Sequence, residues 1–189
     1  VKRVTEVINI PLTVGGGIKD LGDIEVLLEA GASKTSINTA AVKNPHFIKE
    51  ASQKFGKKSM IIAIDGKKSS KTKSGFEVYI EGGRKATGID VCEWAKRTEE
   101  LGAGELLVTS INADGTKQGY DLEFTKKIVE SVKIPVIASG GAGKLEDIWL
   151  VLTEGRADAA LAASIFHFQL YTVRDVKEYL KRKGLEVRV

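Results

Sequence analysis

Two aspartates, Asp65 and Asp114, could carry acid–base chemistry in this chain of 189 residues. Asp65 ends the apolar run SMIIAID, and Asp114 lies in the polar stretch TSINADGT. A positioned carboxylate can take up or release a proton in a reacting substrate. A helix-cap or turn residue is the alternative interpretation of Asp65, and Asp114 could instead order its loop through turn hydrogen bonds.

Glycines and small polar residues predict two anion-binding sites. The stretches IPLTVGGGIKDLGDI, from Ile10, and IPVIASGGAGKLEDI, from Ile134, each indicate a strand, a glycine loop and a helix start. Glycine lets the backbone approach an anion closely, and a helix N-terminus presents free N–H groups. A tight turn would explain either stretch alone, but a small polar turn follows each of them one strand later. The predicted phosphate-binding residues are Gly17, Asn38 and Thr39 at one site and Gly115, Thr116, Gly140, Gly141, Ala163 and Ser164 at the other.

The elements that must position these residues alternate between strands and helices. Short runs rich in Ile, Val, Leu and Ala are typical of buried parallel strands, and glycines stand where the helices should end. The expected strands are 11–14, 34–37, 59–65, 105–110, 135–139 and 158–162, and the expected helices are 21–30, 45–55, 90–101, 122–132, 144–154 and 173–183. Residues 66–88 break the rhythm, and they indicate either a small β-hairpin on a long loop or a flexible polar insertion.

The two glycine-rich stretches are copies of one repeat. They lie 124 residues apart and share nine identities over 22 aligned positions. Four strands fall within one period, so two periods give eight βα units and about 250 residues, the usual size of a (βα)8 TIM barrel. We therefore expect residues 1–189 to form a single truncated barrel domain with six of eight units, strands 3–8, its first quarter preceding Val1. A doubly wound open sheet is the alternative, but it does not explain the repeat.

The barrel interpretation gives the two anion sites a geometry. Strands four apart in an eight-stranded barrel lie on opposite sides, and active sites form at the carboxyl ends of the strands. The two phosphate sites should therefore face each other across the mouth, with Asp65 between them. This arrangement predicts an elongated substrate with a phosphate at each end.

Composition narrows the class of protein further. The chain is 42% hydrophobic and 29% charged with a net charge of +4, which fits one soluble globular domain. It has no apolar run of about 18 residues for a membrane span and no basic stripe interleaved with aromatics for nucleic acid. Cys92, its only cysteine, excludes an internal disulfide and fits a reducing cytoplasm. No Ser-His-Asp pattern and no metal-ligand cluster occurs in the sequence.

Six motifs carry a family resemblance. PLTVGGGIKD, SINTAAVKNP, IIAID, GAGELLVTSINADGTKQGYD, PVIASGGAGK and ADAALAASIFHF resemble the cyclase subunits of imidazole glycerol phosphate synthase, over essentially the whole chain. The resemblance implies a doubly phosphorylated aminoimidazole carboxamide ribonucleotide as substrate, ammonia as co-substrate, no cofactor, and a glutaminase subunit docked on the N-terminal barrel face. The related phosphoribosylformimino isomerases share the barrel, the repeat and the bisphosphate substrate, but TKQGYD and SIFHF favour the cyclase.

The resemblance also implies roles for particular residues. Asp65 matches one of two catalytic aspartates, Thr109 and Ser139 line the site, and Lys34 and Glu105 match two of four charged residues that gate ammonia entry. An ordinary surface salt bridge is the alternative for the last pair. Asn112 departs from the family, which often has Asp there.

The second catalytic aspartate of the family would lie before Val1. A complete chain of 189 residues is therefore expected to lack useful cyclase activity alone. The bare edges of its first and last strands could pair with a second copy. A non-catalytic partial barrel that binds phosphate and self-associates is the remaining alternative.

Overall fold

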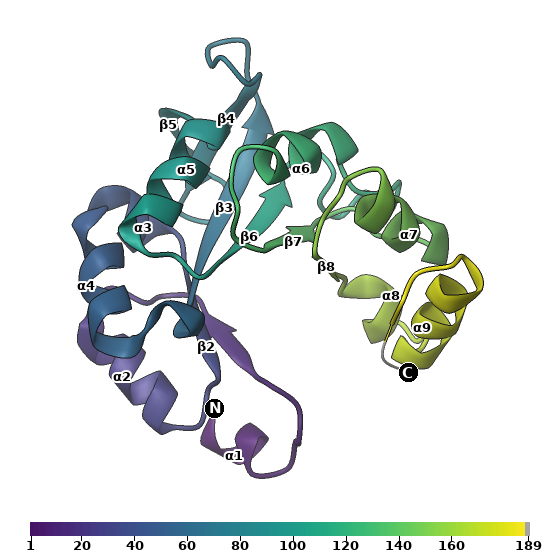
Figure 1. The fold of residues 1–189 in the computed structure, drawn as a ribbon, viewed down its shortest axis with the longest axis horizontal. Helices are drawn as coiled ribbons and strands as arrows, with labels where there is room; N and C mark the ends of the chain where they lie inside the picture. The colour runs from purple at the N-terminus through teal and green to yellow at the C-terminus, as the bar shows by residue number, and fades with distance from the viewer. Residues whose placement is uncertain (188–189) are drawn as a thin grey trace.

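A curved, mostly parallel sheet forms the frame of the molecule. The computed structural model of the chain describes residues 1–187. Six strands pair in the order β1-β2-β3-β6-β7-β8, each parallel to its neighbour, and β1 and β8 end the sheet (Figure 1). The bounds are β1 Thr13–Gly15, β2 Lys34–Ile37, β3 Met60–Lys68, β6 Glu105–Ser110, β7 Val136–Ser139 and β8 Ala159–Leu161.

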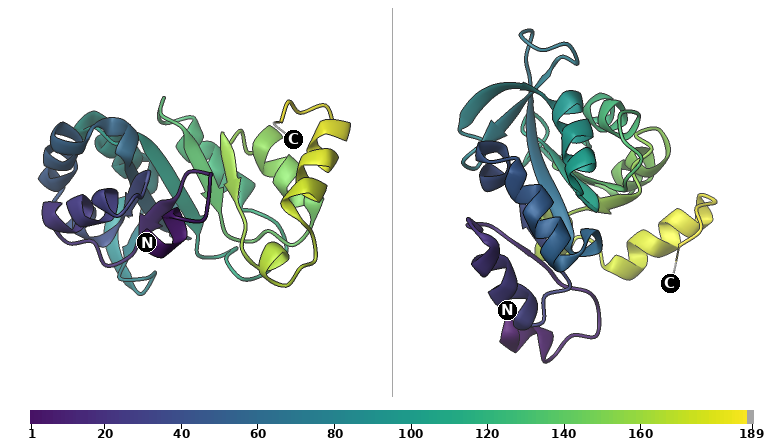
Figure 2. Two further views of the ribbon diagram at one scale, coloured as in Figure 1. Left: turned by 90° about the horizontal axis from the view of Figure 1, so that it is seen from below. Right: turned by 60° about the vertical axis from the view of Figure 1, so that its left-hand side comes forward.

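Helices cover the convex side of this sheet. In Figures 1 and 2 they surround the strands on the outside of the curve, as in a (βα)8 barrel of which a part is present. The long helices are α2 Leu21–Glu29, α4 His46–Phe55, α5 Val91–Leu101, α6 Leu122–Val129, α7 Leu145–Thr153 and α9 Val173–Arg182. The short ones are α1 Lys2–Thr5, α3 Thr39–Lys43, η1 Lys57–Ser59 and α8 Ser164–His167. Within the described residues, none of the helices combines the length and apolar character that crossing a bilayer requires.

The core lies between the sheet and this helical layer. Burial alternates along β6, where Leu106, Val108 and Ser110 are buried and the residues between them are only partly covered. Because successive strand side chains point to opposite faces, the buried set packs against the helices and the other set faces the concave side. Each buried Leu or Val contributes about 1.5–3 kcal/mol, so this period-2 pattern fixes which side chains reach the mouth.

The expected elements are found with boundaries shifted by a few residues, and a short helix stands before the first of them. Val1, Val4 and Val7 recur at helical spacing, but this helix, α1, is only four residues long. Its apolar face is not buried, since Val7 is 81% and Val4 45% exposed. The helical periodicity at the start of the chain therefore does not contribute to the core of the described residues.

Residues 66–88 form the predicted hairpin and are not a flexible insertion. Strand β3 continues past Asp65, and β4, Phe76–Ile80, pairs with it antiparallel before β5, Lys85–Asp90, returns. Phe76, Val78 and Ile80 are all at least 96% buried. The hairpin is thus packed into the core through one face of β4.

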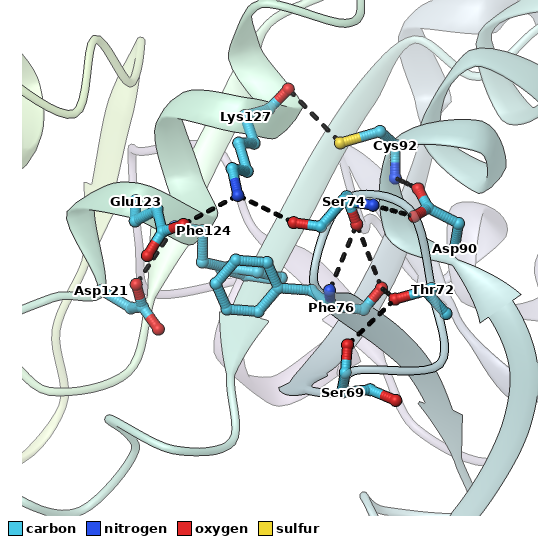
Figure 3. Close-up of polar contacts among 10 residues, drawn as sticks. All are labelled: Ser69, Thr72, Ser74, Phe76, Asp90, Cys92, Asp121, Glu123, Phe124 and Lys127. Carbon is cyan, nitrogen blue, oxygen red and sulfur yellow. Dashed lines mark hydrogen bonds and ion pairs between the residues drawn. The ribbon is translucent and has the colours of Figure 1, made fainter.

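The base of the hairpin is tied to two helices (Figure 3). The backbone N–H of Ser74 donates to Asp90 Oδ2 at 2.6 Å, next to the start of α5. Lys127 of α6 donates to the Ser74 carbonyl at 2.8 Å, and the rings of Phe76 and Phe124 meet edge to face, 5.2 Å apart. These contacts fix the hairpin relative to the sheet on which it lies.

Candidate functional site

A row of four residues crosses the carboxyl ends of the central strands. Strand register pairs Asp65 of β3 with Thr109 of β6, Thr109 with Ser139 of β7, and Ser139 with Leu161 of β8. Paired residues share a face, and neighbouring strands lie about 4.8 Å apart. Asp65, Thr109 and Ser139 therefore stand side by side on the concave face, with Thr109 between the other two.

Asp65 is held in an environment suited to proton transfer. Its carboxyl is partly buried and accepts a hydrogen bond from Asn38 Nδ2 at 2.9 Å. Burial raises the pKa of Asp65, the negative charge of Asp114 raises it further, and the bond from Asn38 partly opposes both effects. A carboxyl whose pKa is moved toward neutrality exchanges protons more readily at working pH. The Asn38 Oδ1 atom is buried and has no hydrogen-bond partner among residues 1–187.

The first pocket lies beside Asp65, over the ends of β1 and β2. It has a volume of about 1080 Å³ and reaches from the glycine loop after β1 to the tip of the hairpin. Gly16 and Gly17 have φ angles of +95° and +77°, which side chains rarely adopt, and a Cβ at either would meet no atom within 4 Å. These two glycines are needed for their backbone shape and border open space, as an anion-binding loop requires. The predicted residues that line this pocket are Gly17, Asn38, Thr39 and Asp65.

The second pocket lies over the ends of β7 and β8 and has a volume of about 240 Å³. Seven predicted residues line it: Asp114, Gly115, Ser139, Gly140, Gly141, Ala163 and Ser164. Leu161 lines both pockets, so the two spaces meet at this side chain. The row of strand residues thus runs from Asp65 in the first pocket to Ser139 and Leu161 in the second.

Glycines at the second pocket are also required by a contact between two loops, which the sequence did not reveal. A Cβ on Gly141 would lie 2.0 Å from the Gly119 carbonyl oxygen, and one on Gly143 would lie 2.1 Å from that of Lys117. The Gly119 N–H also donates to the Gly141 carbonyl at 2.8 Å. The loop after β6 therefore lies directly on the loop after β7, and Gly141 is required by this contact whether or not an anion binds.

The repeated aspartates make the same hydrogen bond in both copies. Asp23 Oδ2 accepts from the Lys19 N–H and Asp147 Oδ2 from the Gly143 N–H, each at 2.8 Å. The helices that carry them, α2 and α7, begin and end at positions shifted by 124. In each copy a carboxylate near the helix start fixes the last part of the glycine loop.

Two of the residues predicted to line the site or to bind phosphate lie outside both pockets. Within the described chain, Thr109 occupies the strand row but lines neither pocket. Thr116 was expected to contact a phosphate, but it is not among the lining residues, and its hydroxyl donates to the Ala113 carbonyl at 2.7 Å. Thr116 therefore orders the loop that carries Asp114 and Gly115. Asn112 is likewise structural here, since its Oδ1 accepts from the Lys68 N–H at 2.9 Å.

The predicted gate residues lie at the other end of the strands. Lys34 begins β2 and Glu105 begins β6, on either side of β3, and their side chains form an ion pair that is partly shielded from solvent. The two residues meet at the N-terminal face, as they would in an ordinary salt bridge as well as in a gate. They are separated from Asp65 by the length of the strands.

Three lysines line the pockets although their sequence positions were not singled out. Lys19 and Lys43 line the first pocket and Lys117 the second. Lys117 immediately follows the predicted loop residues, and Lys43 stands one helical turn after Thr39, so spacing could have indicated both. Among the described residues, no group of His, Cys, Asp and Glu is arranged to hold a metal ion.

The parallel sheet, its outer helices and the polar carboxyl ends of its strands define a protein of the (βα)8-barrel class, of which this chain forms a part. The chain belongs to the histidine biosynthesis protein family, whose model matches residues 1–172. It is 53% identical to the imidazole glycerol phosphate synthase subunit HisF of Clostridium botulinum strain Kyoto (type A2), over all 189 residues and 74% of that protein. The subunits HisF of strains 657 (type Ba4) and Langeland (type F) show the same identity and coverage. These comparisons confirm the resemblance that the motifs carried.

Proposed function

We propose that this chain carries the cyclase site of imidazole glycerol phosphate synthase. The observation that supports the proposal best is the position of Asp65, with its raised pKa, in one of two glycine-bordered pockets that a row of strand residues connects. A ligand that extends along this row can place one phosphate in each pocket and its reacting centre near Asp65. The family and the HisF relatives favour the same reaction.

The substrate of this reaction is a phosphoribulosyl-formimino aminoimidazole carboxamide ribonucleotide, phosphorylated at both ends. Gly17, Asn38 and Thr39 bind one phosphate in the proposal. The other lies against Gly115, Gly140, Gly141, Ala163 and Ser164.

Asp65 acts as general acid–base in this proposal. Ammonia adds to the substrate, the adduct breaks, and ring closure gives imidazole glycerol phosphate and aminoimidazole carboxamide ribotide. Proton transfers accompany both steps, and a positioned carboxyl typically contributes about 10²–10⁴-fold to such steps. Asp114 is the second candidate acid, since it lines the second pocket and its charge acts on Asp65.

The ammonia comes from a glutaminase subunit on the N-terminal face. The HisF relatives are named as subunits of a synthase, which supports a partner of this kind. Lys34 and Glu105 lie on that face, where their ion pair would control the entry of ammonia into the barrel interior. The edges of β1 and β8 offer a second mode of association, between copies of the chain.

The test is ammonium-dependent turnover of the bisphosphate substrate. The chain is assayed alone and after fusion to the part of a HisF relative that lies outside the aligned 74%. Asp65→Asn should lower turnover at least 100-fold, whereas the control Glu130→Gln, which alters an exposed ion pair with Arg156, should not. Isomerisation without ammonia would refute the cyclase and support the related isomerase. Phosphate binding without turnover in the fusion would support the non-catalytic alternative.

A further inference from the structure

The tip of the β4–β5 hairpin holds one face of the short helix α3. The backbone N–H of Glu81 donates to Thr39 Oγ1 at 3.0 Å, and the Glu81 carboxylate pairs with the Lys43 ammonium at 2.8 Å. Thr39 and Lys43 are four residues apart in α3, so they lie on the same side of the helix. One residue of the hairpin therefore contacts two residues that line the first pocket.

The charges around this pocket are unfavourable for an anion as they stand. Its lining contains two lysines and four carboxylates: Lys19, Lys43, Asp20, Glu50, Asp65 and Glu81. A phosphate entering beside Gly17 would need the positive charge of the lysines, because carboxylates repel it. The ammonium group of Lys43 is already paired with Glu81.

We propose that Lys43 is an anion-binding residue of the first pocket and that Glu81 is its exchangeable counter-ion. A phosphate and the Glu81 carboxylate then compete for the Lys43 ammonium. This inference rests on the proposed phosphate site at Gly17 and Thr39, and it adds a cation to that site. Exposed ion pairs are weak, and the Lys43 and Glu81 side chains are 57% and 42% exposed, so exchange is easy.

The competition leaves the hairpin in place. The bond from the Glu81 N–H to Thr39 involves only the backbone of Glu81, and the base of the hairpin is tied to α5 and α6 through Ser74 (Figure 3). Loss of the Lys43 contact therefore frees one side chain and not the whole strand pair. The Glu81 φ angle of +58° is also unaffected by a change from Glu to Gln.

Titration of the full chain with inorganic phosphate, at constant ionic strength and followed by amide NMR, tests the proposal. The Gly17 amide reports the first pocket and the Gly141 amide serves as an internal reference in the second. Glu81→Gln should tighten phosphate binding at Gly17 about two- to fivefold, and Lys43→Met should weaken it by a similar factor. The double variant should bind like Lys43→Met alone, because Glu81 acts through Lys43. None of these variants should change binding at Gly141.

Glu25→Gln is the matched control. Glu25 pairs with Lys54 at 3.0 Å, both side chains are 45% exposed, and neither residue lines the pocket. An unchanged or weakened affinity in Glu81→Gln would overturn the competition. So would an equal gain in the Lys43→Met background, which would show general repulsion by Glu81. Wild-type protein that binds no phosphate at Gly17 would overturn the proposed phosphate site itself, whereas failure of the variants alone overturns only the role of Lys43.

Discussion

Replacing a glycine by alanine should destabilise the fold less at Gly17, in the first pocket, than at Gly141, in the second. Gly17 and Gly141 occupy equivalent places in the repeat, and both have positive φ angles, +77° and +106°. Alanine in a left-handed conformation costs about 1–2 kcal/mol. Gly17→Ala should therefore lower the free energy of unfolding by about this amount, since its Cβ would meet nothing within 4 Å.

Gly141→Ala should be more damaging. Its Cβ would lie 2.0 Å from the Gly119 carbonyl oxygen and 3.2 Å from the Ala113 Cβ, so the two loops must separate. Forcing atoms into a packed interior costs about 1–3 kcal/mol. Added to the conformational term, the expected loss is about 2–5 kcal/mol.

Urea unfolding at pH 7, followed by tryptophan fluorescence and circular dichroism, measures both losses. Gly184→Ala is the matched control, because Gly184 has φ +84°, an unobstructed Cβ position and no place in either pocket. We expect Gly184→Ala and Gly17→Ala to agree within about 1 kcal/mol. If Gly141→Ala unfolds at the same urea concentration as these two, the loop contact does not demand a glycine and the reasoning is wrong.

Three further predictions concern charge and association. The pKa of Asp65 is raised in the folded state, so its ionised carboxylate destabilises the fold once the pH exceeds the unfolded-state pKa, and Asp65→Asn should raise the urea midpoint at pH 7. Asn38→Ala should raise the Asp65 pKa further, as measured by carboxyl NMR, because it removes the hydrogen bond that lowers this pKa. An unmoved pKa would contradict the role of that bond. Burial would raise the Asp90 pKa, but hydrogen bonds from Ser74, Glu93 and Cys92 outweigh burial and lower it. Ionised Asp90 therefore stabilises the fold at a pH above its unfolded-state pKa, and this contribution is lost as the pH falls through its folded-state pKa. Asp90→Ala should cost about 1–2 kcal/mol at pH 7, and an unchanged midpoint would refute the anchoring. The edges of β1 and β8 should give concentration-dependent association in sedimentation velocity, and a single monomer species up to about 100 μM would argue against edge pairing.

The βα order and the position of Asp65 could be predicted because they depend on local patterns. Alternating burial marks the strands, and Asp65 is the first charged residue after the apolar run of β3. The repeat also shows that Asp23 and Asp147 are the same residue type at equivalent positions. Each aspartate accepts a hydrogen bond from the backbone N–H four residues earlier, and this contact is local as well.

The remaining features depend on contacts between distant segments. The clash that excludes a side chain at Gly141 comes from Gly119, and the partner of Lys43 is 38 residues away in the hairpin. No spacing rule links such pairs, because the hairpin position is set by antiparallel pairing with β3. Val4 and Val7 illustrate the converse, since apolar residues at helical spacing remain exposed unless another element covers them.

Leu161 is the side chain that the two pockets share. It is 42% exposed and borders both spaces, so a ligand that uses both pockets can cover its apolar surface. A compound that occupies one pocket alone would leave part of this side chain in contact with water. Burial of apolar surface therefore favours a ligand that spans both spaces.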